Sequence, residues 1–238
     1  MKSKFINYAH RGASHYAPEN TMMSFYLGMQ MGANGIETDI HVTKDGTAVL
    51  FHDDTLLRVT GQPGSVSDYT LEKLQTFLVR KGELCDKIPT FEDFLNHFAF
   101  RDITFAIELK QADVYDKTAD LIRRFGIEKK CVITSFQYAE LLKMRSYAPE
   151  LETGYLTSVV TDELLTDMQK NGIRELCPKA DQITKEKVDT WHGLGFRVRA
   201  WGVADEELMR NAYDCGIDGM TVNFPDKLKA YIEEMSNG

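Results

Sequence analysis

The segment CVITSFQYAELLKMRSYAPELETGYL, residues 131–156, contains the unit that decides the fold. Its first five residues, Cys131–Ser135, are rich in β-branched side chains and predict a strand. Residues 138–147 combine good helix formers and predict a helix, and residues 152–156 predict a second strand. A helix that joins two strands is typical of a parallel sheet, because parallel neighbours need a long crossover connection.

The same strand-then-helix unit recurs in both directions along the chain. Further strands are expected at residues 5–10, 35–42, 103–109, 173–177, 197–201 and 219–222, and further helices at 22–31, 91–98, 114–125, 162–171, 185–194, 206–215 and 225–235. Either Asn20 or Thr21 is expected to cap the first helix. Eight such units in 238 residues predict one α/β domain over residues 1–238, a (β/α)8 TIM barrel rather than an open doubly wound sheet. The chain has no GxGxxG or Walker sequence, which argues against a nucleotide-binding fold.

One stretch interrupts this alternation. Residues 44–46 predict a turn, and residues 47–51 predict an extra strand that returns beside the second one. Residues 53–88 then contain only one short helical pattern, near 71–77. We expect a small insertion at about residues 53–88, after the second strand, which is either a lid or substrate wall or a surface decoration.

Composition narrows the class of protein. With 43% hydrophobic and 27% charged residues, the chain has enough apolar residues for a large core. The net charge of −8 argues against nucleic acid as a partner, because phosphate backbones need a basic surface. A small phosphate-bearing substrate needs only a local positive patch and stays possible.

Location is predicted from the N-terminus, from apolar runs and from cysteines. The first eight residues hold no continuous apolar segment, so we expect no signal peptide. No run approaches the roughly 18 apolar residues of a membrane span. We therefore expect a cytoplasmic protein without stable membrane insertion, and composition leaves its oligomeric state open. The cysteines are widely spaced and are expected to be reduced: Cys85, Cys131, Cys177 and Cys215.

Three acidic residues are placed to form a metal site. Glu37 and Asp39 are two apart on one expected strand, so their side chains share a face, and Glu108 lies near the end of the next barrel strand. Neighbouring strands are about 4.8 Å apart. If all three side chains point inward, the carboxylates repel one another and need a cation, and all-oxygen ligation selects Mg²⁺ or Ca²⁺. The alternative is that Glu37 or Glu108 points outward into a salt bridge.

Two histidines flank this acidic group at strand ends. His10 and His52 are candidates for a general acid and a general base, because imidazole titrates near neutral pH. Arg11 and Lys110 are candidates for binding phosphate oxygens, although each could instead neutralise the neighbouring carboxylates. The other histidines lack this placement, and His41 is expected to border the site or to be structural.

These residues belong to short motifs that run from the first strand to the last: His10-Arg11-Gly12, Pro18-Glu19-Asn20-Thr21, Glu37-Thr38-Asp39, His52-Asp53, Glu108-Leu109-Lys110, Ser135-Phe136, Trp201 and Asp218-Gly219. Together they resemble the glycerophosphodiester phosphodiesterase family. The insertion after His52 also falls where that family carries a small extra subdomain. The resemblance covers nearly the whole chain, and the joint pattern is far more specific than any single motif.

The resemblance implies a metal-dependent enzyme that hydrolyses a glycerophosphodiester to glycerol 3-phosphate and an alcohol. It implies that the cation binds a phosphate oxygen and a glycerol hydroxyl. One of His10 and His52 would take the hydroxyl proton and the other would protonate the leaving alcohol, through a cyclic phosphate. Which histidine is acid and which is base stays open. Trp201 would form an apolar wall for the glycerol carbons, or it simply packs in the core.

The chain departs from the family near its C-terminus. The family usually has an aspartate in a Thr-Asp-x-Pro segment after the last strand, and the matching stretch here is Thr221-Val222-Asn223-Phe224-Pro225. Asparagine keeps the hydrogen-bonding shape but loses the charge. We expect this change to remove an ionic role at the rim and to leave the cluster around His10 unaffected.

Two other classes of function are weighed against hydrolysis of small diesters. Phospholipase D toxins of the sphingomyelinase type resemble the family around the histidines and the metal carboxylates, but they are secreted, usually longer and disulfide-bearing. Activity on lysophospholipids stays open. The second alternative is a catalytically silent phosphodiester-binding protein on the same barrel.

Overall fold

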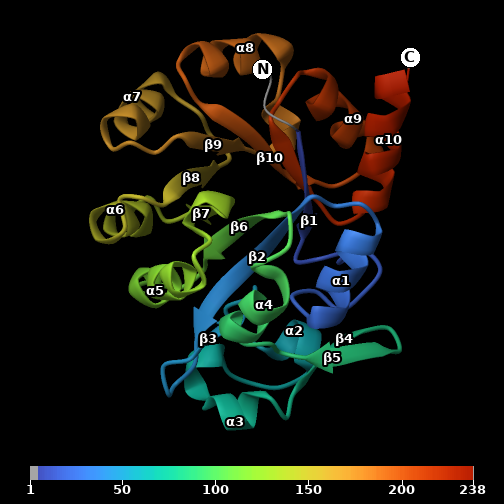
Figure 1. The fold of residues 1–238 in the computed structure, drawn as a ribbon, viewed down its shortest axis with the longest axis vertical. Helices are drawn as coiled ribbons and strands as arrows, with labels where there is room; N and C mark the ends of the chain where they lie inside the picture. The colour runs from blue at the N-terminus through green and yellow to red at the C-terminus, as the bar shows by residue number, and fades with distance from the viewer. Residues whose placement is uncertain (1–4, 238) are drawn as a thin grey trace.

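Eight parallel strands form a closed barrel in the computed structural model, which describes residues 5–237 (Figure 1). The strands are β1 Ile6–His10, β2 Gly35–Val42, β6 Thr104–Leu109, β7 Cys131–Ser135, β8 Glu152–Thr157, β9 Glu175–Pro178, β10 Arg197–Val203 and β11 Gly219–Val222. β1 pairs with both β2 and β11, so the first and last strands close the ring. The predicted (β/α)8 barrel is confirmed. The expectation of no signal peptide depends partly on residues 1–4, which lie outside the described residues.

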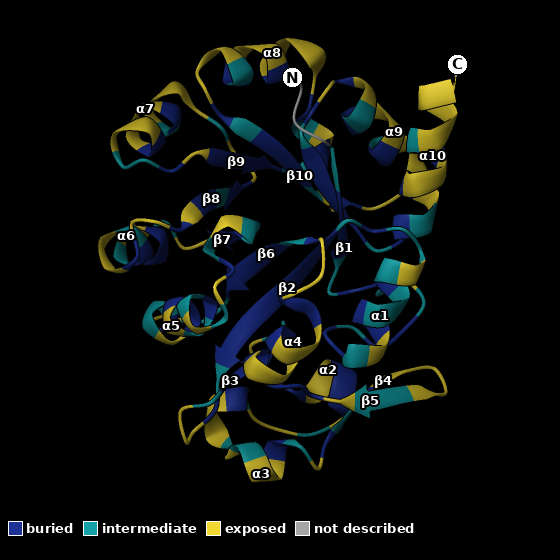
Figure 2. Ribbon diagram, viewed as in Figure 1, coloured by how far each residue is buried: buried dark blue, intermediate teal, exposed yellow. Residues whose placement is uncertain are grey.

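Helices surround the barrel and turn one face toward it (Figure 2). They are α1 Met22–Gln30, α4 Phe91–Phe98, α5 Tyr115–Phe125, α6 Tyr138–Tyr147, α7 Asp162–Lys170, α8 Lys185–Gly193, α9 Glu206–Asp214 and α10 Pro225–Asn237. Thr21 caps α1: its side chain accepts from the Ser24 amide, and the Ser24 side chain accepts from the Thr21 amide. Across residues 5–237, no helix is long and apolar enough to cross a membrane.

An aromatic cluster fixes the helices that cover the first strands. Phe94 on α4 contacts Phe25 on α1, Phe98 on its own helix and Phe105 on β6, with ring centroids 4.8, 5.0 and 5.6 Å apart. All four rings are fully buried. Their packing holds α1 and α4 against the barrel beside β2 and β6, which carry the acidic residues.

A buried ion pair fills part of the barrel interior. Arg199 on β10 donates from Nε to Glu175 Oε1 at 2.6 Å and from Nη1 to Thr221 Oγ1 at 2.7 Å. The Arg199 and Glu175 side chains are 3% and 2% exposed, so the pair is shielded from water. Arg199 Nη2 also lies 3.4 Å from the sulfur of Cys177, and all four cysteines are free thiols.

The stretch between β2 and α4 forms an extra strand and then a small lobe, which lies at the foot of Figure 1. The extra strand is present as β3 Ala48–Leu50, antiparallel to β2. After it come two short helices and a hairpin: α2 Leu57–Thr60, α3 Leu71–Leu74, β4 Leu78–Lys81 and β5 Leu84–Lys87. The helix expected near 71–77 ends at Leu74, since Phe77 already leads into the apolar run of β4. The hairpin was not among the expected elements.

Trp201 does not end its strand, which corrects the expected boundary. β10 continues to Val203, and its register against β11 shifts between Ala200 and Val203. Gly202 sits in this irregularity with φ +67°, a conformation that favours glycine. The resulting bulge re-aims the Trp201 side chain at the mouth of the barrel.

Candidate active site

Three carboxylates meet at the carboxyl end of the barrel strands. Glu37 and Asp39 come from β2 and Glu108 comes from β6, where Asp39 and Glu108 are register partners. One oxygen of each lies within 4.8 Å of the others, and all three residues are buried. The period-two spacing on β2 and the register with β6 thus bring together the acidic residues that the sequence singles out.

Burial and mutual repulsion shift the protonation of this group. Burial and the nearby Asp39 charge raise the pKa of Glu37, and the same causes raise the pKa of Glu108 to about 7. Burial also acts to raise the pKa of Asp39, but the charge of Arg11 and other cations outweighs it and the pKa falls. The group therefore lacks enough positive charge to ionise fully on its own.

The donor set fits a hard divalent cation. Asp39 Oδ1 is buried and has no hydrogen-bond partner among the described residues. Its other oxygen accepts from Asn20 Nδ2 at 2.8 Å, which orients the carboxylate. An unpartnered carboxylate oxygen beside two further carboxylates is the arrangement that Mg²⁺ or Ca²⁺ satisfies. Glu37, Asp39 and Glu108 are therefore the residues that could hold a metal.

The turn after β1 places Arg11 over these carboxylates. Arg11 has φ +54° and Gly12 has φ +80°. A Cβ on Gly12 would lie 2.4 Å from the Ser24 carbonyl carbon, so glycine is required where this turn meets α1. The Arg11 amide donates to Glu37 Oε2 at 3.0 Å. The motif His10-Arg11-Gly12 is thus explained by backbone shape as well as by side-chain chemistry.

The Arg11 guanidinium itself contacts two carboxylates. Its Nε lies 3.4 Å from Asp39 Oδ2, and its Nη1 donates to Glu19 Oε1 at 2.9 Å. The Arg11 side chain is 15% exposed and borders the cavity described below. Arg11 therefore contacts two carboxylates and also lines the cavity, so both of its expected roles stay predictions.

His10 is held by Asn223 across the closure of the barrel. His10 Nδ1 and Asn223 Oδ1 are 2.6 Å apart, and the Ser14 hydroxyl donates to the same oxygen at 2.9 Å. Because an amide oxygen only accepts, His10 carries its proton on Nδ1 and leaves Nε2 free as an acceptor, 3.9 Å from Glu37 Oε2. Burial and the charge of Arg11 lower the pKa of His10 to about 3.

This contact corrects the expectation for Asn223. We expected the residue to act only at the rim and to leave the cluster around His10 unaffected. The structure instead places its side chain in direct contact with His10 and on the wall of the cavity. The expectation was wrong because β11 is adjacent to β1, so the segment after the last strand lies directly beside the end of the first.

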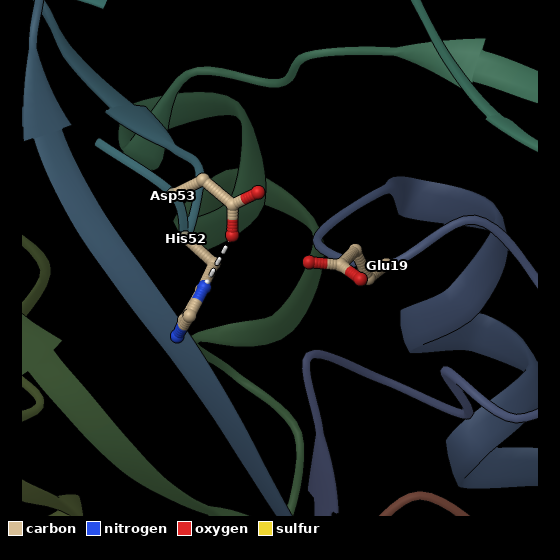
Figure 3. A group of neighbouring side chains, drawn as sticks. All are labelled: Glu19, His52 and Asp53. Carbon is tan, nitrogen blue, oxygen red and sulfur yellow. Dashed lines mark hydrogen bonds and ion pairs between the residues drawn. The ribbon is translucent and has the colours of Figure 1, made fainter. Parts of the chain in front are cut away.

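Both ring nitrogens of His52 contact a charged side chain. Its Nδ1 donates to Asp53 Oδ1 at 2.7 Å, the contact drawn in Figure 3, and its Nε2 lies 3.2 Å from the Lys110 ammonium. Hydrogen bonds from Arg58 and His52 lower the pKa of Asp53 to about 2, so its carboxylate is ionised at neutral pH. Because an ionised carboxylate only accepts, Asp53 fixes a proton on His52 Nδ1, and Nε2 is left to accept from the Lys110 ammonium.

A cavity of about 240 Å³ opens between these groups. Its polar side is lined by His10, Arg11, Glu37, His52, Glu108 and Asn223, and its apolar side by Phe136, Leu156, Trp201 and Val203. The Trp201 ring stacks edge-on against Phe136 with centroids 4.8 Å apart, and its Nε1 donates to the Thr157 carbonyl. Lys110 donates to Glu108 Oε1 at 2.9 Å and lies 5.8 Å from the centre of the Phe136 ring. All the expected site residues therefore line this cavity or contact a residue that does.

The remaining histidines lie outside the cavity. Within residues 5–237, His15, His41, His97 and His192 do not line the cavity. His41 is buried, and its Nε2 lies 3.4 Å from the His52 carbonyl oxygen, so it supports the backbone at His52. Of the two alternatives for His41, bordering the site or a structural role, this contact fits the second.

Several residues that shape the site were not assigned a role from the sequence. Glu19, Asn20, Asp53 and Asn223 each contact a residue that was, and Arg58 contacts Glu19 and Asp53. Glu19, Asn20 and Asp53 lie inside motifs that the sequence analysis quotes, so the signal was present for them. Arg58 had none, because nothing in its own segment distinguishes it from a solvated surface arginine.

Comparison with known proteins gives one consistent family. The model of the glycerophosphoryl diester phosphodiesterase family matches residues 10–227. The chain is 32% identical over 240-odd residues to a glycerophosphodiester phosphodiesterase of Bacillus altitudinis, covering 96% of this chain and 98% of that protein. It is 31% identical to the enzyme of the same name from Caldanaerobacter subterraneus, covering 96% and 97%.

A solved structure supports the fold in the same way. A phosphodiesterase of Oleispira antarctica, determined in complex with the product sn-glycerol-3-phosphate, superposes with a TM-score of 0.83. The match covers 95% of this chain and 96% of that one at 24% sequence identity. At this identity the likeness shows a shared barrel.

Proposed function

The chain belongs to the glycerophosphoryl diester phosphodiesterase family and is a glycerophosphodiester phosphodiesterase; we propose that it releases glycerol 3-phosphate and an alcohol by metal-assisted catalysis with two histidines. One observation carries the proposal. A single cavity is lined by two of the three buried carboxylates, Glu37 and Glu108, and by two histidines that are each held at Nδ1 by an acceptor. The third carboxylate, Asp39, has an unpartnered oxygen. The product complex of the Oleispira antarctica relative supports a small phosphate ester as the ligand.

The carboxylates would hold one divalent cation, Mg²⁺ or Ca²⁺. Glu37, Asp39 and Glu108 supply only oxygen donors, which suits these ions rather than zinc. When bound, the cation would neutralise phosphate charge and lower the pKa of the glycerol hydroxyl beside it. The raised pKa values of Glu37 and Glu108 support this role, since a cation restores their ionised form.

His10 and His52 would divide the proton transfers of the first step. Asn223 leaves His10 Nε2 unprotonated on the side of Glu37, where it accepts the proton of the attacking glycerol hydroxyl. Asp53 holds the Nδ1 proton of His52, and a ring that is also protonated at Nε2 donates that second proton to the leaving alcohol. A new oxygen–phosphorus bond forms, the phosphorus–alcohol bond breaks, and a cyclic phosphate remains. Water then opens this ring with the two histidines in exchanged roles.

The other site residues would bind the substrate. Arg11 and Lys110 place positive charge next to the phosphate as negative charge develops on its oxygens. Trp201 and Phe136 form an apolar wall against which carbon atoms of the substrate pack. The net charge of −8 favours such a small substrate over nucleic acid. A single domain and a cytoplasmic location stay predictions.

One assay tests the reaction, the cation and the alcohol together. Release of glycerol 3-phosphate is measured from glycerophosphocholine, glycerophosphoethanolamine and lysophosphatidylcholine, with Mg²⁺ or Ca²⁺ added back after chelation. We expect release that requires a divalent cation. Binding without turnover at millimolar cation would support a silent binding protein, and unchanged activity after strong chelation would rule out the metal role. Preference for lysophosphatidylcholine would move the substrate class toward lysophospholipids.

A further inference from the structure

Arg58 lies between two carboxylates that serve different parts of the site. It belongs to α2 in the lobe between β3 and α4. Its Nε and Nη2 donate to Asp53 at 2.6 and 2.8 Å, and its Nη1 and Nη2 donate to Glu19 at 2.9 and 2.6 Å. Figure 3 shows the two carboxylates pointing toward one another from separate segments.

The guanidinium takes the position of a cation in this group. Oxygens of Glu19 and Asp53 and a ring nitrogen of His52 all lie within 4.8 Å of one another, which by composition resembles a second metal site. Arg58 already occupies both carboxylates, each with two hydrogen bonds. A planar fork with five donors satisfies two carboxylates at once, which a lysine ammonium cannot reproduce.

Each of the two carboxylates that Arg58 holds also contacts a residue that lines the cavity. Asp53 accepts from His52 Nδ1, so its position sets the tautomer and the plane of the ring. Glu19 accepts from Arg11 Nη1, and Arg11 in turn lies against Asp39. Through these two short chains, one side chain fixes a proton-transfer group on one side and a cation beside the metal carboxylates on the other.

We propose that Arg58 is a positioning residue for the phosphodiesterase reaction, holding Asp53 and Glu19 so that His52 and Arg11 keep their catalytic geometry. The inference rests on the proposed function of His52. It gives the lobe between β3 and α4 a part in catalysis, because α2 supplies the guanidinium. The competing explanation is an exposed salt bridge that contributes only slightly to stability, since the Arg58 side chain is 50% exposed.

Kinetics of Arg58→Ala and Arg58→Lys separate these explanations. Loss of a residue that orients a catalytic group typically costs about 10- to 100-fold in activity. We therefore expect Arg58→Ala to lower kcat by that factor with a much smaller change in KM, Arg58→Lys to recover part of the loss, and millimolar guanidinium ion to restore activity to Arg58→Ala. In an Asp53→Asn background, Arg58→Ala should cost less than it does alone, because the two residues act in one chain.

A matched control removes a comparable ion pair elsewhere. Arg124 contacts Glu92 at 2.6 Å, its side chain is 55% exposed, and neither residue borders the cavity. Arg124→Ala should leave kcat and KM unchanged. If Arg58→Ala behaves like Arg124→Ala, or if its kcat loss tracks a loss of folded protein in thermal unfolding and guanidinium restores nothing, Arg58 has no positioning role.

A spectroscopic measurement keeps this test independent of turnover. Histidine ¹⁵N spectra, with the His52 signal identified from a His52→Asn variant, report which ring nitrogen carries the proton. We expect His52 Nδ1 to carry a proton throughout in the wild type, and a mixture of Nδ1–H and Nε2–H rings in Arg58→Ala. An inactive wild type with this spectral change would reject the phosphodiesterase function while showing that Arg58 still orients His52. An unchanged spectrum would reject the positioning role whatever the activity.

Discussion

His10 Nδ1 lies 2.6 Å from Asn223 Oδ1, although the two residues are 213 positions apart in the chain. The contact exists because β1 and β11 are neighbours in the barrel. It makes the asparagine amide, rather than a carboxylate, the group that sets the tautomer of His10. The charge state of His10 therefore depends on Asn223, the residue at which we expect this chain to depart from the family pattern.

Asn223→Asp should move the pH profile of the reaction. A carboxylate at this position stabilises the charged ring, so the pKa of His10 rises from its depressed value of about 3. If His10 acts unprotonated in the first step, the acidic limb of kcat/KM shifts to higher pH by about one pH unit or more. The profile is measured with glycerophosphocholine from about pH 2.5 to about 9, so that the range includes the depressed pKa of His10. If the acidic limb does not move, the group that titrates in the pH profile is not His10.

Replacing either histidine should reduce turnover, and the leaving group should distinguish them. His10→Ala and His52→Ala are each expected to lower kcat by about 10²-fold or more on glycerophosphocholine. On a glycerophosphodiester with p-nitrophenol as its alcohol, His52→Ala should recover most of the loss, because this leaving group needs no proton. If His10→Ala recovers its turnover on this substrate instead, His10 is the acid and His52 is the base.

Glu37→Gln should weaken the metal site without unfolding the barrel. The amide keeps the shape of the side chain but removes one of three negative charges near the cation. We expect a higher cation concentration for half-maximal activity, measured by titrating Mg²⁺ or Ca²⁺ into metal-free enzyme. Glu92→Gln, outside the cavity, is the control. Equal cation requirements in both variants would contradict the assignment of Glu37 as a ligand.

Asp53 should stabilise the fold in a pH-dependent manner. Its pKa is lowered to about 2, chiefly by hydrogen bonds from Arg58, against an ordinary value of 3.8. A carboxyl group with a lowered folded-state pKa contributes its stability above the unfolded-state pKa and loses it as pH falls through the folded-state value. The difference in free energy of unfolding between wild type and Asp53→Asn should thus be constant from neutral pH to about 5 and shrink below about pH 4. Urea unfolding across this range measures it, and a difference that grows toward acid would contradict the pairing.

Arg199→Ala should destabilise the barrel without touching the proposed proton-transfer groups. Its removal leaves Glu175, which is 2% exposed, with the partly exposed Arg197 as its remaining partner, whose Nη2 lies 3.0 Å from Glu175 Oε2. Breaking a buried ion pair from one side typically costs about 3–5 kcal/mol. Denaturant unfolding measures the loss, and Arg124→Ala should lose less than about 1 kcal/mol. Comparable losses in the two variants would show that the buried pair contributes little.

The sequence predicted those features that depend on local periodicity. Alternation of strand and helix patterns gave the barrel, and the two-residue spacing of Glu37 and Asp39 gave their shared face. The prediction that Glu108 lies close to these two residues followed from the expected adjacency of their two strands. The short elements of the lobe were harder to predict, because the β4–β5 hairpin carries only a few apolar side chains and packs little of its surface into a core.

Contacts between distant segments could not be read from the sequence. Asn223 reaches His10 through barrel closure, and Arg58 reaches Glu19 across 39 positions. Such contacts depend on where loops end in space, and neither residue type nor spacing records this. The bulge at Gly202 was missed for a similar reason, since one extra residue in a strand leaves the apolar pattern almost unchanged.

Closure of the ring by β1 and β11 also has a consequence for synthesis of the protein. On the ribosome, Ile6–His10 emerges first and must wait for Gly219–Val222 before one of its edges is paired. Its partner β2 arrives early, but the other edge stays open while nearly all of the chain is made. A nascent chain thus carries His10 long before Asn223 can orient it, so activity should arise in a late, all-or-none event when the last strand docks.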